Sequence, residues 1–587
     1  MARKAVRILG ILGLVLGLSV MGLAQTKTLT ILHTNDTHSA LLPFTHQPYP
    51  TPFTWLWPDH RQGWLDEFRG PGGFNRDYAG IARMSTLIKR IRQAKGNVLA
   101  FHSGDVFVGS FMFNKFLGNP ELKIMEDLYD AMTPGNHEFD LGISTLESVL
   151  YGEYPGMSPV ALPMINANYN FEAVGSYPAS RLAGLMQDHI IKTVDGIKVG
   201  IFGMGNEDPT NFTAEMIARF QGTDEKLYIC AATQAGTLRA AGCRVVICLS
   251  HLGTMYDAEL LSQVPGIDII VGGHSHDLFD RADLRNGKII VQAGSHGRWL
   301  GELRIAVDPS GRVRFLNWRT HELDKTVRPD PEIQARLEVL QGLVEADPRF
   351  GLVFTEPVAY AVRNIHHDWP ATGPNRDAAL GILVADAMKK ALLAASAADP
   401  NLPPVHCVLD PLGYTEFGIP AGKVVGNDIL RAVPYGYDPA SGLGFKLVVV
   451  PLDGQTILAL LEYTVTYVEY TRSLCVQPSG LTFAYNSKNP AATELGQIRR
   501  LDPMSVKIGD EYVAANLTKP YFIGMTDQVY KFLNTLTRGQ ISLKFDSGIL
   551  EYNAVRDYVQ SLGFVKYVSE GRVIDTAPAT AAVFRRK

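Results

Sequence analysis

Cysteine is scarce in this sequence. The chain has five cysteines among 587 residues and no Cys-X-X-Cys pair. So few thiols exclude a fold that depends on a framework of disulfides, and they give no support to a cysteine-based metal site. One disulfide would still leave an odd thiol. Cys243 and Cys248 lie around an apolar run, a placement typical of core residues.

The sequence also lacks an excess of charge of one sign. Its 55 Lys and Arg residues against 59 Asp and Glu residues give a net charge of −4. This balance argues against bulk electrostatic binding of a nucleic-acid polymer or an anionic membrane. At about 100–200 residues per domain, a chain of this length is expected to form two or three domains.

A long apolar run, ILGILGLVLGLSVMGLA, follows three basic residues near the start of the chain. Because small residues, Gly22 and Ala24, close the run, it predicts a signal peptide over 1–24. An uncleaved membrane anchor is the alternative, since the run is slightly long for a signal peptide. With cleavage, the mature protein is expected to be periplasmic or secreted and to have no stable membrane span.

Short apolar runs bounded by Gly, Asn or Asp recur through the first half of the chain. The clearest are TLTILH, NVLAF, IKVGIFG, RVVICLS, IDIIVGG and GKIIVQAG. Their Val and Ile content predicts buried strands. Residues 80–95 place apolar side chains at helical spacing, with basic residues on the other face. Alternating strands and helices predict an α/β domain over about 28–325.

A second domain is expected after residue 350. Pro331 and Pro348 bound a stretch of helix-forming residues, which predicts a connecting helix at 330–346. A further α/β domain is predicted over 350–587. Residues 46–79 differ from both, because they are rich in Pro, Gly and aromatic residues without periodicity. Such a segment is either a functional lid or a surface insertion whose aromatic side chains pack locally.

Side chains that can bind metal follow the predicted strands. TLTILH leads into NDTH, NVLAF into HSGD, RVVICLS into a histidine and IDIIVGG into HSH, while GNHEFD occupies 135–140. In α/β sheets, ligands bind at the carboxyl ends of the strands, so these side chains are expected to converge. The candidate ligands are Asp36, His38, Asp105, Asn136, His251, His274 and His276.

The chemistry of this set points to divalent transition metals. Imidazole, carboxylate and amide ligands without thiolate suit Mn, Zn or Fe better than Ca or an iron–sulfur cluster. Seven ligands are too many for one tetrahedral site. They suit two ions about 3.5–4 Å apart that share a carboxylate, activate a water and clamp a phosphoryl group. We therefore expect two divalent metal ions as cofactors.

The ordered motifs NDTH, SGD, GNHEFD, SHLG and GGHSH resemble those of the calcineurin-like metallophosphoesterases. The two-part length, the VDGIKVGIFG run and the export signal are similar to the secreted 5′-nucleotidase / 2′,3′-cyclic nucleotide phosphodiesterase family. The motifs are dense over about 28–305 and sparse over 350–560. The resemblance implies a four-layer αββα sandwich followed by a smaller α/β (α+β) C-terminal substrate domain. It also implies hydrolysis of a small phosphate ester, with nucleotides as the first candidates.

The resemblance further implies roles for individual residues. Asp36, His38 and His276 would bind one metal, and Asn136, His251 and His274 the other, with Asp105 bridging the two. His137 and Asp140 match the catalytic dyad of the family. Because Asp140 would favour the charged imidazole, His137 could stabilise the developing phosphorane and assist the leaving oxygen. Four residues match no ligand and are interpreted as structural: His33, His102, Glu138 and His296, the last with a supporting role at the metals as the alternative.

The C-terminal half departs from the family pattern. The family motif NXGGIR corresponds here to DPLGYTEFGIPAG, with Asp410 in place of Asn and Thr415 in place of Arg. Ala379 stands where an earlier arginine is expected, unless Arg376 takes its place. Since arginine binds phosphate through bidentate, charge-assisted contacts, these changes predict weaker binding of a 5′-monophosphate dianion.

Three further residues match substrate-binding positions of the family: Tyr435, Tyr521 and Asp527. The tyrosines could stack on a base, and a role in the core is the alternative. Two other functions stay open. One is the same metal chemistry on a sugar phosphate or a thiosulfate-type ester. The other is a non-catalytic, metal-containing binding protein, although a structural metal site needs no acid dyad. Metal identity and oligomeric state are left open by the sequence.

Overall fold

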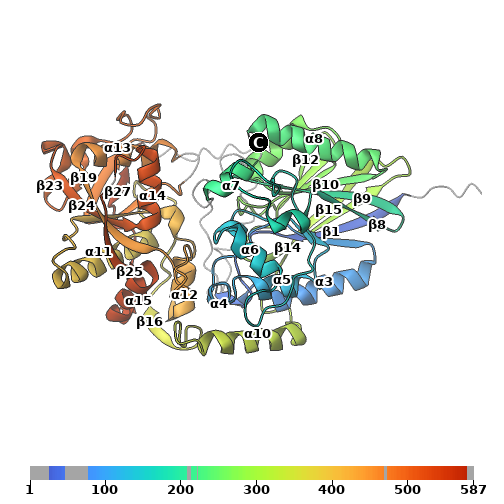
Figure 1. The fold of residues 1–587 in the computed structure, drawn as a ribbon, viewed down its shortest axis with the longest axis horizontal. Helices are drawn as coiled ribbons and strands as arrows, with labels where there is room; N and C mark the ends of the chain where they lie inside the picture. The colour runs from blue at the N-terminus through green and yellow to red at the C-terminus, as the bar shows by residue number, and fades with distance from the viewer. Residues whose placement is uncertain are drawn as a thin grey trace, which may run out of the picture.

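The structure is a computed structural model that describes residues 26–45, 77–207, 213–220, 223–468, 472–541 and 543–577. The predicted signal peptide and most of the 46–79 segment lie outside the described residues. Two α/β domains lie side by side, the N-terminal domain in blue to green and the C-terminal domain in yellow to red (Figure 1). A search of the described helices for one with the length and hydrophobicity to cross a membrane finds none.

Two sheets form the centre of the N-terminal domain. The first contains, in spatial order, β15 (Val313–Glu322), β14 (Trp299–Val307), β1 (Lys27–Thr34), β4 (Val98–His102), β5 (Ala131–Met132), β6 (Met164–Ile165) and β7 (Met186–Gln187). The second contains β12 (Asp283–Arg285), β13 (Lys288–Val291), β11 (Ile269–Val271), β10 (Val245–His251), β9 (Ile197–Gly205) and β8 (His189–Val194). The short strands β2 (Phe44–Thr45) and β3 (Asp77–Tyr78) pair antiparallel. All six predicted apolar runs are therefore strands.

Most neighbouring strands in these sheets are parallel. β1, β4, β5, β6 and β7 run in one direction, and β9, β10, β11 and β13 do the same in the second sheet. Antiparallel partners close the edges at β14, β15, β8 and β12. The carboxyl ends of the parallel strands consequently lie together, which is the arrangement that the sequence motifs require.

The strand β1 shows how the layers are held together. Leu29 and Ile31 lie in the core that includes residues of both sheets, whereas Leu32 lies in the core that includes the helix α3 (Ile81–Lys95). The alternation follows from the period of two along a strand. His33 is fully buried and its ring stacks on Trp318 at 5.3 Å. This placement agrees with the interpretation of His33 as a core residue.

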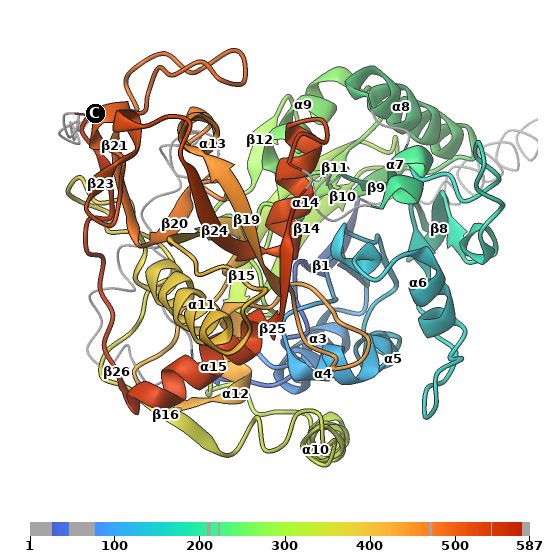
Figure 2. The same cartoon turned by 60° about the vertical axis from the view of Figure 1, so that its left-hand side comes forward.

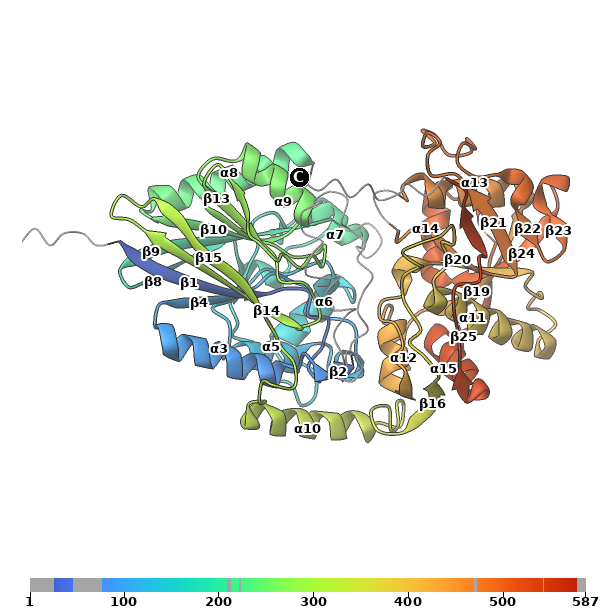
Figure 3. The ribbon, with the colours of Figure 1, turned by 180° about the vertical axis from the view of Figure 1, so that it is seen from behind.

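Helices cover the outer faces of the two sheets, which gives the expected four layers (Figure 3). On the side of the first sheet lie α3, α4 (Phe111–Phe116), α5 (Asn119–Met125) and α6 (Ile143–Leu150). On the side of the second sheet lie α8 (Asp224–Ala240) and α9 (Thr254–Gln263), with α7 (Ala214–Arg219) before them in the chain.

The helix α10 (Pro331–Glu345) leads from one domain to the other beneath the first sheet (Figure 1). Its N-terminus is capped by Asp330, whose side chain accepts hydrogen bonds from the backbone N–H groups of Glu332 and Ile333. The same carboxylate accepts from Ser85 and Lys89 of α3. These contacts fix the start of α10 to the N-terminal domain.

The C-terminal domain is built on a five-stranded sheet with helices around it (Figure 2). In spatial order its strands are β20 (Val476–Ser479), β17 (Cys407–Pro411), β24 (Pro520–Thr526), β19 (Lys446–Asp453) and β25 (Phe545–Leu550). Two smaller sheets contain β18 (Gly422–Val425), β16 (Pro357–Ala361) and β26 (Phe564–Val565), and β23 (Glu511–Tyr512), β22 (Lys507–Ile508), β21 (Leu481–Tyr485) and β27 (Val573–Asp575). The helices are α11 (Ala379–Ala398), α12 (Gly426–Ala432), α13 (Gly454–Thr466), α14 (Asp527–Leu536) and α15 (Glu551–Leu562). This domain has the smaller α/β (α+β) architecture expected from the sequence.

Candidate metal centre

The loops that follow the parallel strands bring six of the seven predicted ligands together, all but Asn136. Two groups of side chains each place one ligand atom per residue within 4.8 Å of the others: Asp36, His38 and Asp105 form one, and Asp105, His251 and His274 form the other. Asp105 belongs to both groups. A carboxylate that faces two neighbouring sites is what a pair of metal ions with a bridging ligand requires.

Distances within the cluster fit a set of ligands around a common centre. The Nε2 atoms of His38 and His276 face each other at 3.2 Å, and Asp36 Oδ1 lies 3.5 Å from His276 Nε2. Asp105 Oδ2 lies 2.9 Å from His251 Nε2. Imidazole nitrogens and carboxylate oxygens gathered at these distances form a donor set suited to divalent transition metals.

Contacts with the backbone orient these side chains. His251 Nδ1 lies 2.6 Å from the carbonyl oxygen of Ser103, which fixes the ring so that Nε2 points into the cluster. The backbone N–H of His274 donates to both oxygens of Asp36 at 3.0 Å. The backbone N–H of His137 donates to Asp105 Oδ1 at 2.9 Å. The chain thus orients the side chains before any ligand is added.

The ligand loops have an unusual backbone. Five predicted ligands have positive φ angles, namely Asp36 (50°), His38 (44°), Asp105 (56°), His274 (73°) and His276 (57°). Residues other than glycine rarely adopt this left-handed region, since their Cβ crowds the backbone. Such strain persists only where the surroundings fix it, and it is concentrated at functional sites.

Two glycines allow these loops to approach one another. A Cβ built on Gly104 would lie 2.6 Å from both the backbone nitrogen of Gly135 and His251 Nδ1. A Cβ on Gly135 would lie 2.2 Å from Asp105 Oδ1 and 2.6 Å from His251 Nε2. No side chain fits at either position, so the glycines of the SGD and GNHEFD motifs are required by the closeness of the loops.

Glu138 holds two of these loops together. Its carboxylate is buried and accepts hydrogen bonds from the backbone N–H groups of Gly135, Asp105, Val106 and Phe107 at 2.6–3.2 Å. Burial, reinforced by the charge of Asp105, raises the pKa of Glu138 to about 7. The sequence indicated only a structural role for this residue, and the structure shows that its role is to position the loop of Asp105.

His137 and Asp140 form a pair at the edge of the cluster. The short 3-10 helix His137–Phe139 follows Asn136 and places His137 Nδ1 2.8 Å from Asp140 Oδ2. The ring of His137 lies 5.3 Å from that of His38, centroid to centroid. Its side chain is 10% exposed, so it lies at the boundary between the buried ligands and the solvent.

Charges within the cluster interact strongly. Burial raises the pKa of Asp36 to about 6, although His276 and His251 oppose the shift. Burial also acts to raise the pKa of Asp105, but the neighbouring His251 and His137 hold it well below its usual range. Burial disfavours a charged His251, yet Asp105 raises its pKa to about 9. Since metal ligands must be deprotonated, an ion at this centre would displace a proton from His251.

The C-terminal domain contributes Tyr435 to this region. Its ring stacks on that of His137, and its hydroxyl donates to Glu416 Oε2 at 2.9 Å. Tyr521 is instead 1% exposed within the core of the C-terminal domain, where its ring contacts His406. Asp527 begins α14 and binds the backbone N–H of Lys446 and the ammonium of Lys531. Of these three residues, Tyr435 is therefore the one that the structure places beside His137.

The positions where the family motif is altered lie inside the C-terminal domain. Asp410 and Thr415 are 0% and 1% exposed. The hydroxyl of Thr415 donates to the carbonyl oxygen of Leu412. Arg376 lies 3.5 Å from Asp575 Oδ2 and donates to nearby carbonyl groups.

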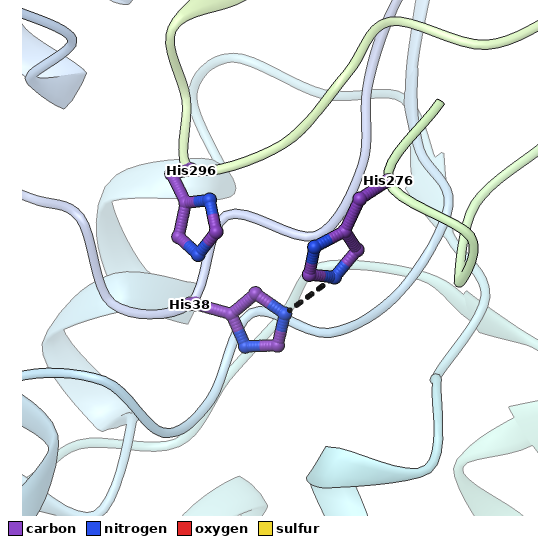
Figure 4. Close-up of side chains that lie close together, drawn as sticks. All are labelled: His38, His276 and His296. Carbon is purple, nitrogen blue, oxygen red and sulfur yellow. Dashed lines mark hydrogen bonds between the residues drawn. The ribbon is translucent and has the colours of Figure 1, made fainter. Parts of the chain in front are cut away.

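Three residues that were not predicted as ligands adjoin the cluster. His296 lies in a third group of potential ligand atoms, with His38 and His276 (Figure 4). Glu416 of the C-terminal domain lies 3.3 Å from His296 Nε2, and Asn206 Nδ2 lies 3.2 Å from His274 Nε2. The sequence provided only a weak indication that Glu416 belongs to the site: it directly follows Thr415, which stands in place of the Arg of the family motif.

Comparison with known proteins agrees with this geometry. Residues 29–278 match the calcineurin-like phosphoesterase family, and residues 363–526 match the 5′-nucleotidase C-terminal domain. The chain is 26% identical over 583 residues to a snake venom 5′-nucleotidase of Naja atra, covering 94% of this chain and 99% of the relative. It is also 26% identical to the trifunctional nucleotide phosphoesterase protein YfkN of Bacillus subtilis, covering 93% of this chain but only 35% of that longer relative. The crystal structure of a 5′-nucleotidase precursor from Thermus thermophilus matches with a TM-score of 0.74 at 25% identity, covering 94% of this chain and 100% of that chain.

Proposed function

We propose that this chain is a two-metal phosphoesterase, because residues 29–278 match the calcineurin-like phosphoesterase family and residues 363–526 match the 5′-nucleotidase C-terminal domain. Its first candidate substrates are nucleotides, as a 5′-nucleotidase, a 2′,3′-cyclic nucleotide phosphodiesterase or both. The observation that carries the proposal is the position of Asp105, which belongs to both ligand groups and accepts from the backbone of His137. We take 28–325 as the metal domain and 350–587 as the substrate domain.

The residues present fit two divalent cations, Mn, Zn or Fe. Asp36, His38 and His276 would hold one ion, and Asn136, His251 and His274 the other, with Asp105 shared. When bound, such ions polarise a phosphoryl oxygen and lower the pKa of a water nucleophile. The inward-facing His38 and His276 nitrogens, 3.2 Å apart, support this assignment.

We assign the proton chemistry to His137. Its Nδ1 lies 2.8 Å from Asp140 Oδ2, and we assign the contact with substrate to Nε2. Asp140 fixes the tautomer and stabilises the charged imidazole. His137 would then donate from Nε2 to the phosphoryl group or the leaving oxygen, a contribution typically of about 10²–10⁴-fold in rate.

For substrate binding we propose Tyr435 as the aromatic contact, because it lies against His137. Tyr521 and Asp527 match the family pattern, but they would have to leave their present partners to meet a substrate. A second candidate function is hydrolysis of a non-nucleotide ester. It is favoured by Asp410 and Thr415, which replace the Asn and Arg of the family motif.

We place the reaction outside the cytoplasm, in the periplasm or the surrounding medium. The basic and apolar residues within 1–24 support export. The balanced net charge of −4 supports a small molecule over a nucleic-acid polymer as partner.

A substrate panel tests these proposals. Protein loaded separately with Mn, Zn or Fe is assayed on an aryl phosphate, a bis-aryl phosphodiester, AMP, 2′,3′-cyclic AMP and a sugar phosphate, beside Asp105→Asn as the control. Hydrolysis of the aryl esters and of at least one nucleotide is expected, with loss of activity in the control. Higher kcat/KM for the sugar phosphate would favour the second candidate. A fully metallated protein that hydrolyses none of these esters would support a binding protein and overturn the enzyme proposal.

A further inference from the structure

Glu416 reaches from the C-terminal domain to the metal centre of the N-terminal domain. Its Oε1 lies 3.3 Å from His296 Nε2 and 3.7 Å from His276 Nδ1, and its Oε2 accepts from the Tyr435 hydroxyl at 2.9 Å. Burial acts to raise the pKa of Glu416, but His296 and His276 hold it well below its usual range. The carboxylate thus lies against two imidazoles of the other domain.

The segment that carries Glu416 is fixed at the domain junction. The backbone N–H groups of Glu416 and Phe417 donate to the carbonyl oxygens of Ala432 and Arg431 at the end of α12. The Arg431 guanidinium lies 3.7 and 3.8 Å from the centroids of the Phe44 and Phe417 rings, which also contact each other at 5.3 Å. Since Phe44 belongs to the N-terminal domain, this cation–π stack joins the two domains directly beside Glu416.

His276 is the link between Glu416 and the predicted metal. Its Nε2 faces His38 Nε2 and Asp36 Oδ1, whereas its Nδ1 faces Glu416. A carboxylate on the far nitrogen of a metal-binding histidine fixes the ring orientation and makes the ligating nitrogen more basic. Glu416 Oε1 faces this nitrogen of His276 at 3.7 Å, longer than a hydrogen bond, and it comes from another domain.

His296 completes the arrangement. Its Nδ1 lies 2.8 Å from Ser295 Oγ, which leaves Nε2 toward Glu416 and the other histidines (Figure 4). Its φ angle of 56° places it in the same left-handed region as the predicted ligands. Its ring packs against Phe417 at 4.1 Å, so it also contacts the segment that carries Glu416.

We propose that Glu416 and His296 belong to the site of the metal held by Asp36, His38 and His276, and that this metal stabilises the domain arrangement seen here. Glu416 positions the ring of His276, and His296 provides a further nitrogen as a potential metal ligand. The inference rests on the proposed two-metal centre and extends it, because one of the two sites becomes dependent on both domains. We assign Glu416 to this site and not to the one around His251 and His274.

Two consequences follow from linkage. If the C-terminal domain must be in this arrangement for Glu416 to reach His276, a metal ion at the site favours the arrangement. The arrangement favours the metal by the same factor, since coupling between two equilibria is reciprocal. Loss of a carboxylate behind a metal-binding histidine typically lowers metal affinity by about 10–100-fold.

Metal binding and solution scattering test the proposal without a substrate. Metal-free wild type, Glu416→Gln, Glu416→Asp and His296→Gln are titrated with Zn²⁺ in competition with a chromophoric chelator, which resolves two affinities. Glu494→Gln, at an exposed position of the same domain, is the matched control for loss of a carboxylate. Small-angle X-ray scattering of each protein is recorded with and without metal, and the visible spectrum is recorded after loading with Co²⁺.

In the wild type we expect two sites and scattering with metal that agrees with this structure. Glu416→Gln should weaken one site by about 10–100-fold, leave the other unchanged, alter the Co²⁺ spectrum and abolish the effect of metal on scattering. Glu416→Asp should show a smaller loss, because it keeps the charge on a shorter side chain. The control should match the wild type.

Unchanged affinities and spectra in Glu416→Gln and His296→Gln, with scattering that does not respond to metal, would overturn the proposal. A wild type that binds fewer than two ions would instead overturn the two-metal centre, so the two failures are distinguishable. If Glu416→Gln does not fold, Glu416→Asp and His296→Gln carry the same comparison.

Discussion

The ring of Tyr435 stacks on the ring of His137 across the two domains, with centroids 5.4 Å apart and planes at 23°. The Tyr435 hydroxyl also donates to Glu416, which itself lies beside His276. One side chain of the C-terminal domain thus contacts both His137, the proposed catalytic residue, and Glu416. The position of His137 consequently depends on how the domains are packed.

Replacement of Tyr435 should separate the effects of its ring and its hydroxyl. Tyr435→Ala removes the stack on His137, and we expect kcat/KM to fall by about 2–10-fold, the equivalent of one aromatic contact. Tyr435→Phe keeps the ring and should retain most of the activity. Steady-state kinetics on a phosphodiester would measure both. Equal losses in the two variants would show that the hydroxyl, and not the ring, is the important group.

His137→Ala should abolish most turnover while leaving the metals bound. The backbone N–H of His137 donates to Asp105, and the imidazole is not one of the proposed ligands, so the side chain can be removed without loss of a ligand. We expect kcat to fall by about 10²–10⁴-fold, with a smaller fall for Asp140→Asn. His189→Ala, on the edge strand β8, is the control. Turnover that survives in His137→Ala with full metal content would exclude the assigned role.

Gly135→Ala should lose metal binding. The added methyl would lie 2.2 Å from Asp105 Oδ1, so the shared carboxylate or the loop must move. Gly236→Ala, on the helix α8, is the matched control because a Cβ there meets nothing within 4 Å. Metal content by atomic emission and folding by circular dichroism would measure the effect. A Gly135→Ala protein with two ions bound would contradict the described packing of the loops.

Removal of metal should destabilise the N-terminal domain more than the C-terminal domain. The buried carboxylates of Asp36 and Asp105 lie within 4.8 Å of each other, together with His38, and an ion bound only by the folded state adds stability. We expect a chelator to lower the Tm of the transition assigned to this domain. Calorimetry with and without chelator measures the shift, and readdition of metal should reverse it. An equal Tm with and without chelator, in protein that was first saturated with metal, would argue against an ion at this site.

Acid should destabilise the N-terminal domain through His33. Burial lowers the pKa of His33 to about 3, below the ordinary value of 6.5. Below pH 6.5 the unfolded chain therefore binds a proton that the folded domain does not, and stability falls as the pH falls. One such group contributes about 1.4 kcal/mol per pH unit between the two values. His33→Phe, which keeps a ring against Trp318, should reduce this slope in urea unfolding of the metal-free protein, and an unchanged slope would contradict the assignment.

The sequence by itself determined the layered N-terminal domain. The apolar runs around Leu29, Ile247 and Ile270 are strands because their composition and length are local properties, and parallel pairing then brings the strand ends together. Asp36, Asp105 and His251 were therefore predicted as neighbours although more than 200 residues separate the first from the last. The structure places their ligand atoms at one site.

Only the tertiary structure decided which C-terminal residues meet that site. Tyr521 lies in a core and Tyr435 lies on His137, a difference that no local pattern encodes, because both are aromatic residues near strand or helix ends. Glu416 and His296 are 120 residues apart and carry no shared motif. They meet because Phe44, Phe417 and Arg431 fix one domain against the other. Periodicity predicts which face of an element is buried, whereas contacts between domains depend on the packing of surfaces built from distant segments.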